Sequence, residues 1–326
     1  MSSLSRFFAA QDMTEGTPWK KIVSFAIPLL IGNIAQQLYN TADSVIVGKY
    51  VGDLALAAVG GCGPTLNLLI VLFVGIATGA SIMVAQYFGA KKKEELSYAV
   101  GTCMVLTLIA SLFMMVLGTA VSAPMLRMLG TPEETYDMCV SYMQIIFLGI
   151  AGGGFYNILS GVLRGLGDSM SALKYLVIAA LLNIVLDLVF VAQFNMGVAG
   201  VAIATDLAQF ISAGLCAWKL FAMRDVMHLQ RKHFGFHRDY AMQLVRLGLP
   251  SGLSQAVMSC SALVVQSLTN SFGAVFVACN TIVMRVDGFV MMPNFSFGNA
   301  MTTFTGQNIG AGRMDRVVEG AKSGLK

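Results

Sequence analysis

Long apolar blocks separated by short polar connections run through almost the whole chain. A helix needs about 20 apolar residues to cross the ~30 Å hydrocarbon core of a bilayer. Within that core only helices and closed barrels satisfy every backbone polar group. The pattern therefore predicts an all-α, polytopic membrane helical bundle of about eight transmembrane helices. The expected spans are 20–48, 54–87, 97–122, 138–163, 172–194, 198–221, 241–272 and 275–309.

Composition supports this fold class. Hydrophobic residues make up 56% of the chain and charged residues 12%, whereas soluble domains carry about 25% charged residues. The mean hydropathy is +0.72. These values exclude an ordinary soluble domain and make the lipid bilayer the first expected partner.

The basic residues concentrate on alternate connections between the apolar blocks. They lie before the first block and after the second, fourth, sixth and eighth, while the other connections carry only Lys49 and Arg127. Cytoplasmic loops of membrane proteins are enriched in lysine and arginine. We therefore expect a cell-membrane protein with a cytoplasmic N-terminus. The net charge of +4 is then a topology signal, and no nucleic-acid partner is expected.

An internal repeat relates the start of the chain to its last third. Residues 19–95 can be laid over residues 240–316 with one gap, and an even number of spans lies between the copies. Both copies then enter the membrane in the same direction, as in transporters built from two parallel halves. The matched positions are Pro28 with Pro250, Gln86 with Gln307, Gly89 with Gly310 and Ala90 with Ala311.

The repeat sets the expected domain organisation. Residues 1–218 form a six-helix N-terminal lobe, 219–239 a cytoplasmic linker between lobes, and 240–326 the first two helices of a second lobe. Two complete lobes would have about twelve helices. Two interpretations stay open: a truncated product or record, or a chain whose missing helices are supplied by a partner.

Asn183 and Asp187 lie inside the fifth apolar block, in the stretch YLVIAALLNIVLDLVFVAQF. A carboxylate at the bilayer centre costs roughly 2.5–3.5 kcal/mol on insertion scales. The two residues are four positions apart and share one helix face, so both can point into an internal cavity. Asp43 in the first span could converge on them. Such a pair can hold a proton, or can ionise and hold Na⁺; interhelical hydrogen bonding alone is the plainer interpretation.

Four segments carry a resemblance to a known family. They are FAIPLLIGNIAQQLYNTADSVIVGKYVG in the first span, GVLRGLGD at 161–168, GVAGVAIAT at 197–205 and GQNIGAG at 306–312. In this order they resemble the multidrug and toxic compound extrusion (MATE) transporters. The resemblance implies a V-shaped pair of six-helix lobes. It also implies export of amphipathic, often cationic compounds in exchange for H⁺ or Na⁺.

The resemblance further implies an ion-coupling site in the N-terminal lobe. Its motif residues match Asp43, Asn183, Asp187 and Thr205, which are together a possible Na⁺ site. The family's fourth-span asparagine falls on Ser160 in this chain. Another branch of the family uses a seventh-span glutamate, which is absent here. Asp206 faces about 100° away from Thr205 on a helix. Its side chain could line the cavity or contact another helix.

Further candidates serve bending and substrate binding. Proline inside a helix removes a backbone hydrogen bond and promotes a kink, so Pro28 and Pro250 are the expected hinges. Polar and methionine side chains of the first, seventh and eighth spans are candidates for lining a substrate cavity, with interhelical hydrogen bonding the alternative for the polar ones. These are Asn33, Gln36, Gln37, Asn40, Gln255, Met258 and Met292.

The function expected from these features is secondary active antiport of amphipathic, cationic compounds against H⁺ or Na⁺, with no other cofactor. An enzyme is not expected, because no histidine lies in any span. Two alternatives remain. A lipid-linked precursor or polysaccharide flippase of the same superfamily is disfavoured by spans nearly free of lysine and arginine, and a truncated remnant would transport nothing.

Overall fold

The computed structural model describes residues 11–272 and 274–324, and every regular element in these ranges is a helix. The predicted all-α class is confirmed. The elements are α2 (Pro18–Tyr50), α3 (Asp53–Gly89), α4 (Lys93–Met128), α5 (Glu133–Leu148), α6 (Ile150–Gly165), α7 (Ser169–Asp187), η1 (Leu188–Gln193), α8 (Gly197–Ala222), η2 (Arg231–His233), α9 (Arg238–Ser271), α10 (Ala274–Gly310) and α11 (Met314–Gly324).

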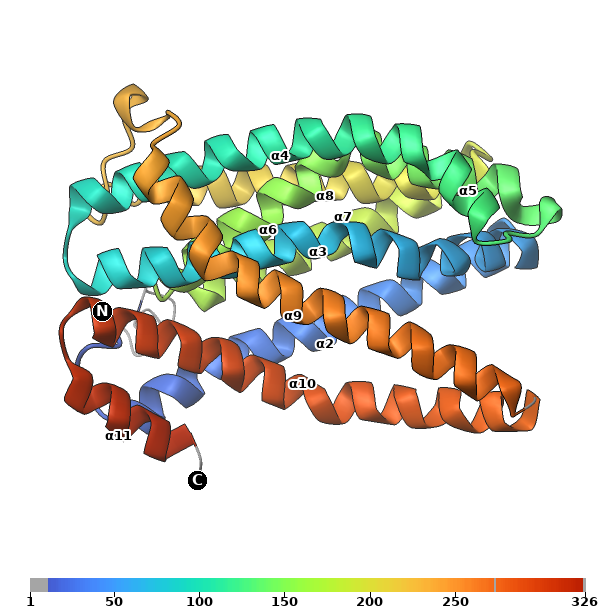
Figure 1. The fold of residues 1–326 in the computed structure, drawn as a ribbon. Helices are drawn as coiled ribbons and strands as arrows, with labels where there is room; N and C mark the ends of the chain where they lie inside the picture. Colours follow the sequence, from blue (N-terminus) through green and yellow to red (C-terminus); the bar gives the residue numbers. More distant parts are fainter. Residues whose placement is uncertain (1–10, 273, 325–326) are drawn as a thin grey trace.

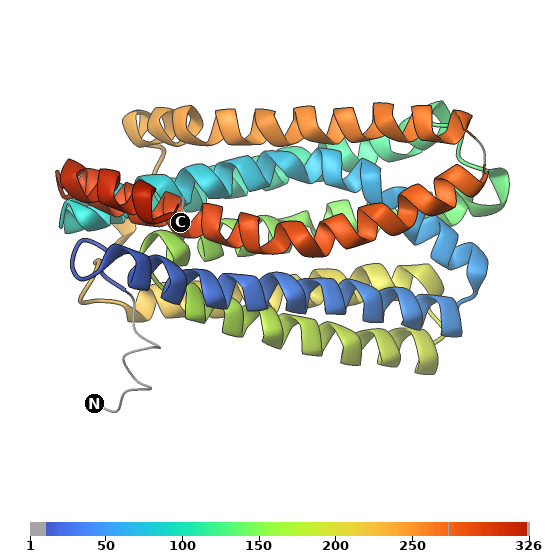
Figure 2. The same ribbon diagram turned by 90° about the horizontal axis from the view of Figure 1, so that it is seen from below.

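The long helices run roughly side by side, and the start of α2 and helix α11 lie at one end of the bundle, here called the terminal end (Figures 1 and 2). Helices α2 to α8 pack around shared apolar clusters. Helix α9 lies along α3, and α10 packs against both α3 and α2. The last two long helices are therefore held mainly by the first two, as expected if they begin a second copy of the same unit.

Four helices in the described ranges are both long and apolar enough to cross a membrane, and five if the bent pair α5–α6 counts as one span. Helices α3, α9 and α10 contain 37, 34 and 37 residues, and at 1.5 Å per residue this length alone suffices for a span. The multi-pass membrane architecture follows from the apolar helices. The predicted count of about eight spans stays an expectation.

Two expected spans differ in detail from a straight helix. The span expected at 138–163 breaks at Gly149, where α5 and α6 meet at a bend of 52°. A side chain at Gly149 would collide with the carboxyl group of Asp206 on α8, so the glycine at this position lets α8 approach closely. The span expected at 172–194 changes to a π-helix directly after Asp187.

The start of α7 is set by a local cap. Asp168 accepts hydrogen bonds from the amide nitrogen of Ser171 at 2.9 Å and from its hydroxyl at 2.7 Å. Gly167 adopts φ +84° just before the cap, a left-handed conformation that glycine reaches without strain. The GLGD sequence therefore fixes where α7 begins, and with it the register of the polar residues further along the helix.

The ends of α3 and α10 meet in a reciprocal contact at the terminal end. A side chain at Gly89 would collide with the backbone carbonyl of Gln307, and one at Gly310 with that of Gln86. These four residues are two of the pairs matched by the sequence repeat. Each copy of the motif thus places its glycine against the glutamine backbone of the other copy, which supports the repeat assignment.

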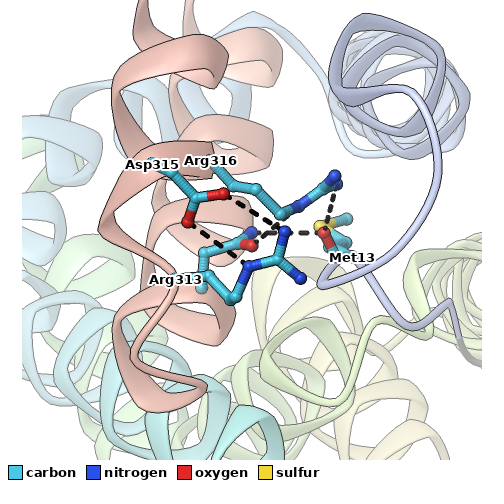
Figure 3. A network of polar contacts seen from close by, with 5 residues as sticks. Met13, Arg313, Asp315 and Arg316 are labelled. Carbon is cyan, nitrogen blue, oxygen red and sulfur yellow. Dashed lines mark hydrogen bonds and ion pairs between the residues drawn. The ribbon is translucent and has the colours of Figure 1, made fainter.

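The segment before α2 is inserted beside this contact. Met13 is fully buried; its backbone nitrogen donates to Oε1 of Gln307 at 2.8 Å, and its carbonyl accepts from Arg316 Nη2 at 3.2 Å. Figure 3 shows Arg316 reaching Met13, while Arg313 pairs with Asp315 nearby. Gln11 also bonds Gly167 through its backbone nitrogen at 3.0 Å. The segment therefore connects the GLGD loop with α10 and α11.

Arg316→Ala should loosen this segment. Removing a buried, charged donor costs about 1.5–3 kcal/mol, and Arg316 is 8% exposed. Amide hydrogen exchange in residues 11–17 should therefore accelerate by roughly tenfold or more. Arg313→Ala is the matched control, because its pair with Asp315 is exposed and should leave exchange unchanged. Equal exchange rates in the two variants would show that Arg316 does not anchor the segment.

Candidate ion-coupling site

Carboxyl groups from α2 and α7 meet inside the bundle. The carboxyl groups of Asp43 on α2 and Asp187 on α7 lie close enough to interact directly. Asp187 is completely buried and Asn183, one turn earlier, is 1% exposed. The structure therefore brings together the two acidic residues that the sequence placed on separate spans.

Asn183 and Thr205 extend this contact to α8. The Asn183 amide satisfies both neighbours when its nitrogen faces Oδ2 of Asp187 at 2.8 Å and its oxygen accepts from the backbone nitrogen of Thr205 at 3.1 Å. The Thr205 hydroxyl lies 3.3 Å from the same amide. Tyr39, on α2, lies beside Thr205. These contacts join α2, α7 and α8 into one polar network.

The network can hold a proton. Two carboxyl groups form a hydrogen bond only when one of them is protonated, because an ionised carboxylate offers acceptors alone. A proton shared by Asp43 and Asp187 would therefore join the two carboxyl groups. Loss of the proton would leave two negative charges in contact inside the bundle, and their repulsion would favour separation of α2 from α7.

The same pair has oxygen atoms available for a metal ion. Oδ1 of Asp43 and Oδ1 of Asp187 are both buried and have no hydrogen-bond partner. Oxygen donors of this kind suit hard cations. The donor set of Asp43, Asn183, Asp187 and Thr205 therefore also fits Na⁺, with the two unpaired carboxyl oxygens as its ligands.

A π-helix begins immediately after the site. Asp187 is the last α-helical residue of α7 and precedes η1, which covers Leu188–Gln193. π-Helical turns are rare and occur frequently at functional sites. Nothing in the apolar sequence LVFVAQ signals this change, and the sequence alone predicts an ordinary helix there.

Ser160 does not join the network among the contacts that the structure describes. Its hydroxyl donates to the backbone carbonyl of Asn157 at 3.0 Å and lies 3.4 Å from Arg164 Nη1. Asn157, one turn earlier on α6, instead lines a cavity beside Thr205. Tyr39 was also missed. Its position four residues before Asp43, on the same helix face, was the available signal.

The candidate hinges and substrate contacts are more dispersed. Helices α2 and α9 continue through Pro28 and Pro250. Asn33 donates to Ser296 Oγ on α10 at 3.0 Å, and Gln36 donates to Asn40 at 3.3 Å. The remaining candidates are not drawn into one pocket by any contact in the described residues: Gln37, Gln255 and Met258 are exposed, and Met292 is half-buried.

A repeated bundle of apolar helices with a polar network inside one lobe has the architecture of a membrane transporter. The chain belongs to the MATE family: the MatE family model matches residues 28–189 and 250–326. The chain is 31% identical over 313 residues to the probable multidrug resistance protein YpnP of Bacillus subtilis, covering 94% of this chain and 69% of that protein. It is 29% identical to the probable multidrug resistance protein YoeA of the same species, covering 97% and 70%.

Solved structures agree with this assignment. A MOP superfamily transporter from Pyrococcus furiosus superposes with a TM-score of 0.90 at 30% identity, covering 96% of this chain and 70% of that chain. A structure described as the outward-facing conformation of a multidrug resistance MATE transporter gives 0.89 at 30% identity, with the same coverage. The chain is therefore a multi-pass membrane transporter of the multidrug efflux family, and not an enzyme.

Proposed function

We propose that this chain exports amphipathic organic cations from the cytoplasm in exchange for protons, and that Asp43 and Asp187 carry the exchanged proton. The observation that carries the proposal is the close approach of these two carboxyl groups from different helices. A proton explains that contact directly, whereas Na⁺ would bind the ionised pair. The protein would lie in the cell membrane with its N-terminus in the cytoplasm.

Movement in this proposal follows from charge. With the proton bound, Asp43 holds α2 against α7, and Tyr39 and Asn183 hold both helices to Thr205 on α8. Without it, the two carboxylates repel each other and attract a cationic substrate. Pro28 lies in the same helix, and its missing backbone hydrogen bond makes it the place where α2 would bend. Proton and substrate then favour different positions of α2, as exchange requires.

Transport into vesicles tests the coupling ion. We expect purified chain in vesicles with an acidic lumen to accumulate ethidium from a neutral exterior, because protons leaving the lumen would drive the cation inward. Fluorescence records the uptake. Vesicles with a Na⁺ gradient and equal pH on both sides are the comparison, and vesicles without protein are the blank.

Two outcomes would contradict the proposal. Uptake driven by Na⁺ but not by the pH difference would remove the proton from its role at the carboxyl pair. No uptake under either gradient, with protein that elutes as a folded species, would instead favour the interpretation as a remnant without transport.

A further inference from the structure

The linker between α8 and α9, residues 223–237, is held against the start of α4 (Figure 1). The backbone nitrogen of His228 donates to Ser97 Oγ at 3.2 Å, and Lys93 Nζ donates to the backbone carbonyl of Asp225 at 2.6 Å. The short helix η2 within the linker also packs against α4. The linker is therefore fixed on the surface of the first lobe by specific contacts, and it can form a preorganised binding site.

Two adjoining surface cavities lie along this linker. The first, of about 240 Å³, lies between the linker and α4, and the second, of about 270 Å³, lies between the linker and the end of α8. His228 and Gln230 line both cavities, so the two share a wall. Both volumes are below the about 300–1,000 Å³ typical of pockets for drug-sized molecules. The cavities therefore suit a small group better than an exported compound.

The titratable side chains that line the two cavities are mostly basic. They are Lys93, Arg224, His228, Lys232 and His233, with Glu94 as the single carboxylate. Glu94 is paired with Lys232, whose Nζ lies 2.8 Å from Oε1. Arg224 is exposed and has no ion-pair partner in the part of the chain that the structure describes. The lining thus keeps a positive charge after internal pairing, which favours an anionic ligand.

His233 adds a hydrogen-bond donor at the wall of the first cavity. Its Nδ1 accepts a hydrogen bond from the backbone nitrogen of Gln230 at 3.0 Å, so the hydrogen of the neutral ring lies on Nε2. Nε2 is buried and has no hydrogen-bond partner among the described residues. Buried polar groups in folded proteins rarely lack a partner. An anionic oxygen atom bound in the cavity would supply the missing acceptor.

Exposed aromatic side chains lie next to these basic groups. Phe221 lines the second cavity, and its ring stacks on that of Phe234 with centroids 6.2 Å apart. Trp218, three positions before Phe221 on α8, is 67% exposed, and Phe236 is 62% exposed. Aromatic rings of membrane proteins concentrate at the level of the lipid headgroups. Basic clusters directly beyond a membrane helix attract anionic lipids, so the neighbouring anion that fits this position is a headgroup phosphate.

We propose that the linker and the start of α4 bind the phosphate group of an anionic phospholipid at the wall shared by the two cavities. Arg224, Lys93 and Lys232 supply positive charge, and His228 and His233 supply ring N–H donors. The acyl chains would lie along the exposed aromatic rings at the end of α8. A bound lipid would then hold α8, α4 and the linker together. This role goes beyond the proposed proton exchange and does not depend on it.

Thermal unfolding of the purified full chain in a neutral detergent tests the site, with phosphatidylglycerol or phosphatidylcholine added at equal concentration. A ligand that binds only the folded state raises the unfolding temperature as its concentration rises. We expect phosphatidylglycerol to raise the midpoint of the wild type more than phosphatidylcholine does. Arg224→Gln and His228→Gln should each lose at least half of that difference.

Arg231→Gln is the matched control, because it removes an exposed charge of the same linker that lines neither cavity, and it should keep the full difference. Arg224 and His228 are exposed as well, and the hydrogen bond of His228 to Ser97 uses its backbone nitrogen. Both test variants should therefore fold.

Three outcomes would overturn the proposal. Equal shifts with the two lipids would show that the headgroup charge is not recognised. Equal losses in Arg224→Gln and Arg231→Gln would indicate general attraction to the linker without a defined site. A shift of the same size with sodium phosphate, at constant ionic strength, would assign the cavities to a soluble phosphate compound. Failure of the pH-driven ethidium experiment would contradict the proposed function and leave these outcomes unaffected.

Discussion

Asp187→Asn should reduce pH-driven ethidium transport by about tenfold or more, a loss of at least ~1.4 kcal/mol in coupling. Asparagine has nearly the same shape and can still accept from Asn183, which faces Oδ2 of Asp187 at 2.8 Å. It cannot bind and release a proton in the relevant pH range. Because Asp187 is fully buried without a basic partner among the described residues, the substitution should preserve or raise the thermal stability. The measurement is initial ethidium uptake per folded protein in vesicles.

Asp137→Asn serves as the control, since it removes a carboxylate from an exposed position of α5 and should leave uptake unchanged. Asp43→Asn should resemble Asp187→Asn, because each variant removes one half of the same pair. Normal uptake by a folded Asp187→Asn protein would exclude the pair from proton coupling.

Gly310→Ala should produce the largest loss of stability among conservative substitutions at the terminal end. The added methyl group would collide with the backbone carbonyl of Gln86, and a backbone group within α3 cannot rotate away. Overpacking of this kind costs typically 1–3 kcal/mol. We expect a lower unfolding temperature and slower ethidium uptake, because α3 and α10 could no longer close against each other. Thermal unfolding and the vesicle assay measure the two effects.

The matched control is Gly214→Ala on α8. No atom lies within 4 Å of a methyl group added there, and alanine is favoured over glycine inside a helix by roughly 0.5–1 kcal/mol. Gly214→Ala should therefore be neutral or slightly stabilising. Equal unfolding temperatures for Gly310→Ala and Gly214→Ala would mean that the contact with Gln86 is looser than the structure indicates.

The parts of the fold that depend on local pattern could be predicted from the sequence. Apolar length identified the helices, and the four-residue spacing of Asn183 and Asp187 placed them on one face. Their meeting with Asp43 and Thr205 was an expectation from the family resemblance. The spacing of residues within one helix does not determine which neighbouring helix their shared face contacts. The contact itself became visible only once α2, α7 and α8 were packed together.

Other features depend on long-range contacts and left no local signal. The bend at Gly149 lies in a continuous apolar run, and the need for glycine there depends on Asp206, which lies 57 positions later in the chain. The burial of Met13 depends on Gln307 and Arg316, about three hundred residues away. The resemblance placed the fourth-span site residue at Ser160, whereas packing leaves Asn157 nearest to Thr205 in the shared cavity. The rotation of a helix about its own axis determines which of its residues faces the site, and amino-acid composition does not predict that rotation.

The reciprocal contact of Gly89 with Gln307 and Gly310 with Gln86 also bears on how such a chain could have arisen. A surface whose glycine fits the glutamine backbone of an identical copy is self-complementary, which is the defining property of a two-fold symmetric homodimer interface. A single unduplicated unit carrying this motif would already present both the glycine and the glutamine that form the contact. Fusion of two genes for such a unit would then have preserved an existing dimer interface, and no new interface would have had to evolve.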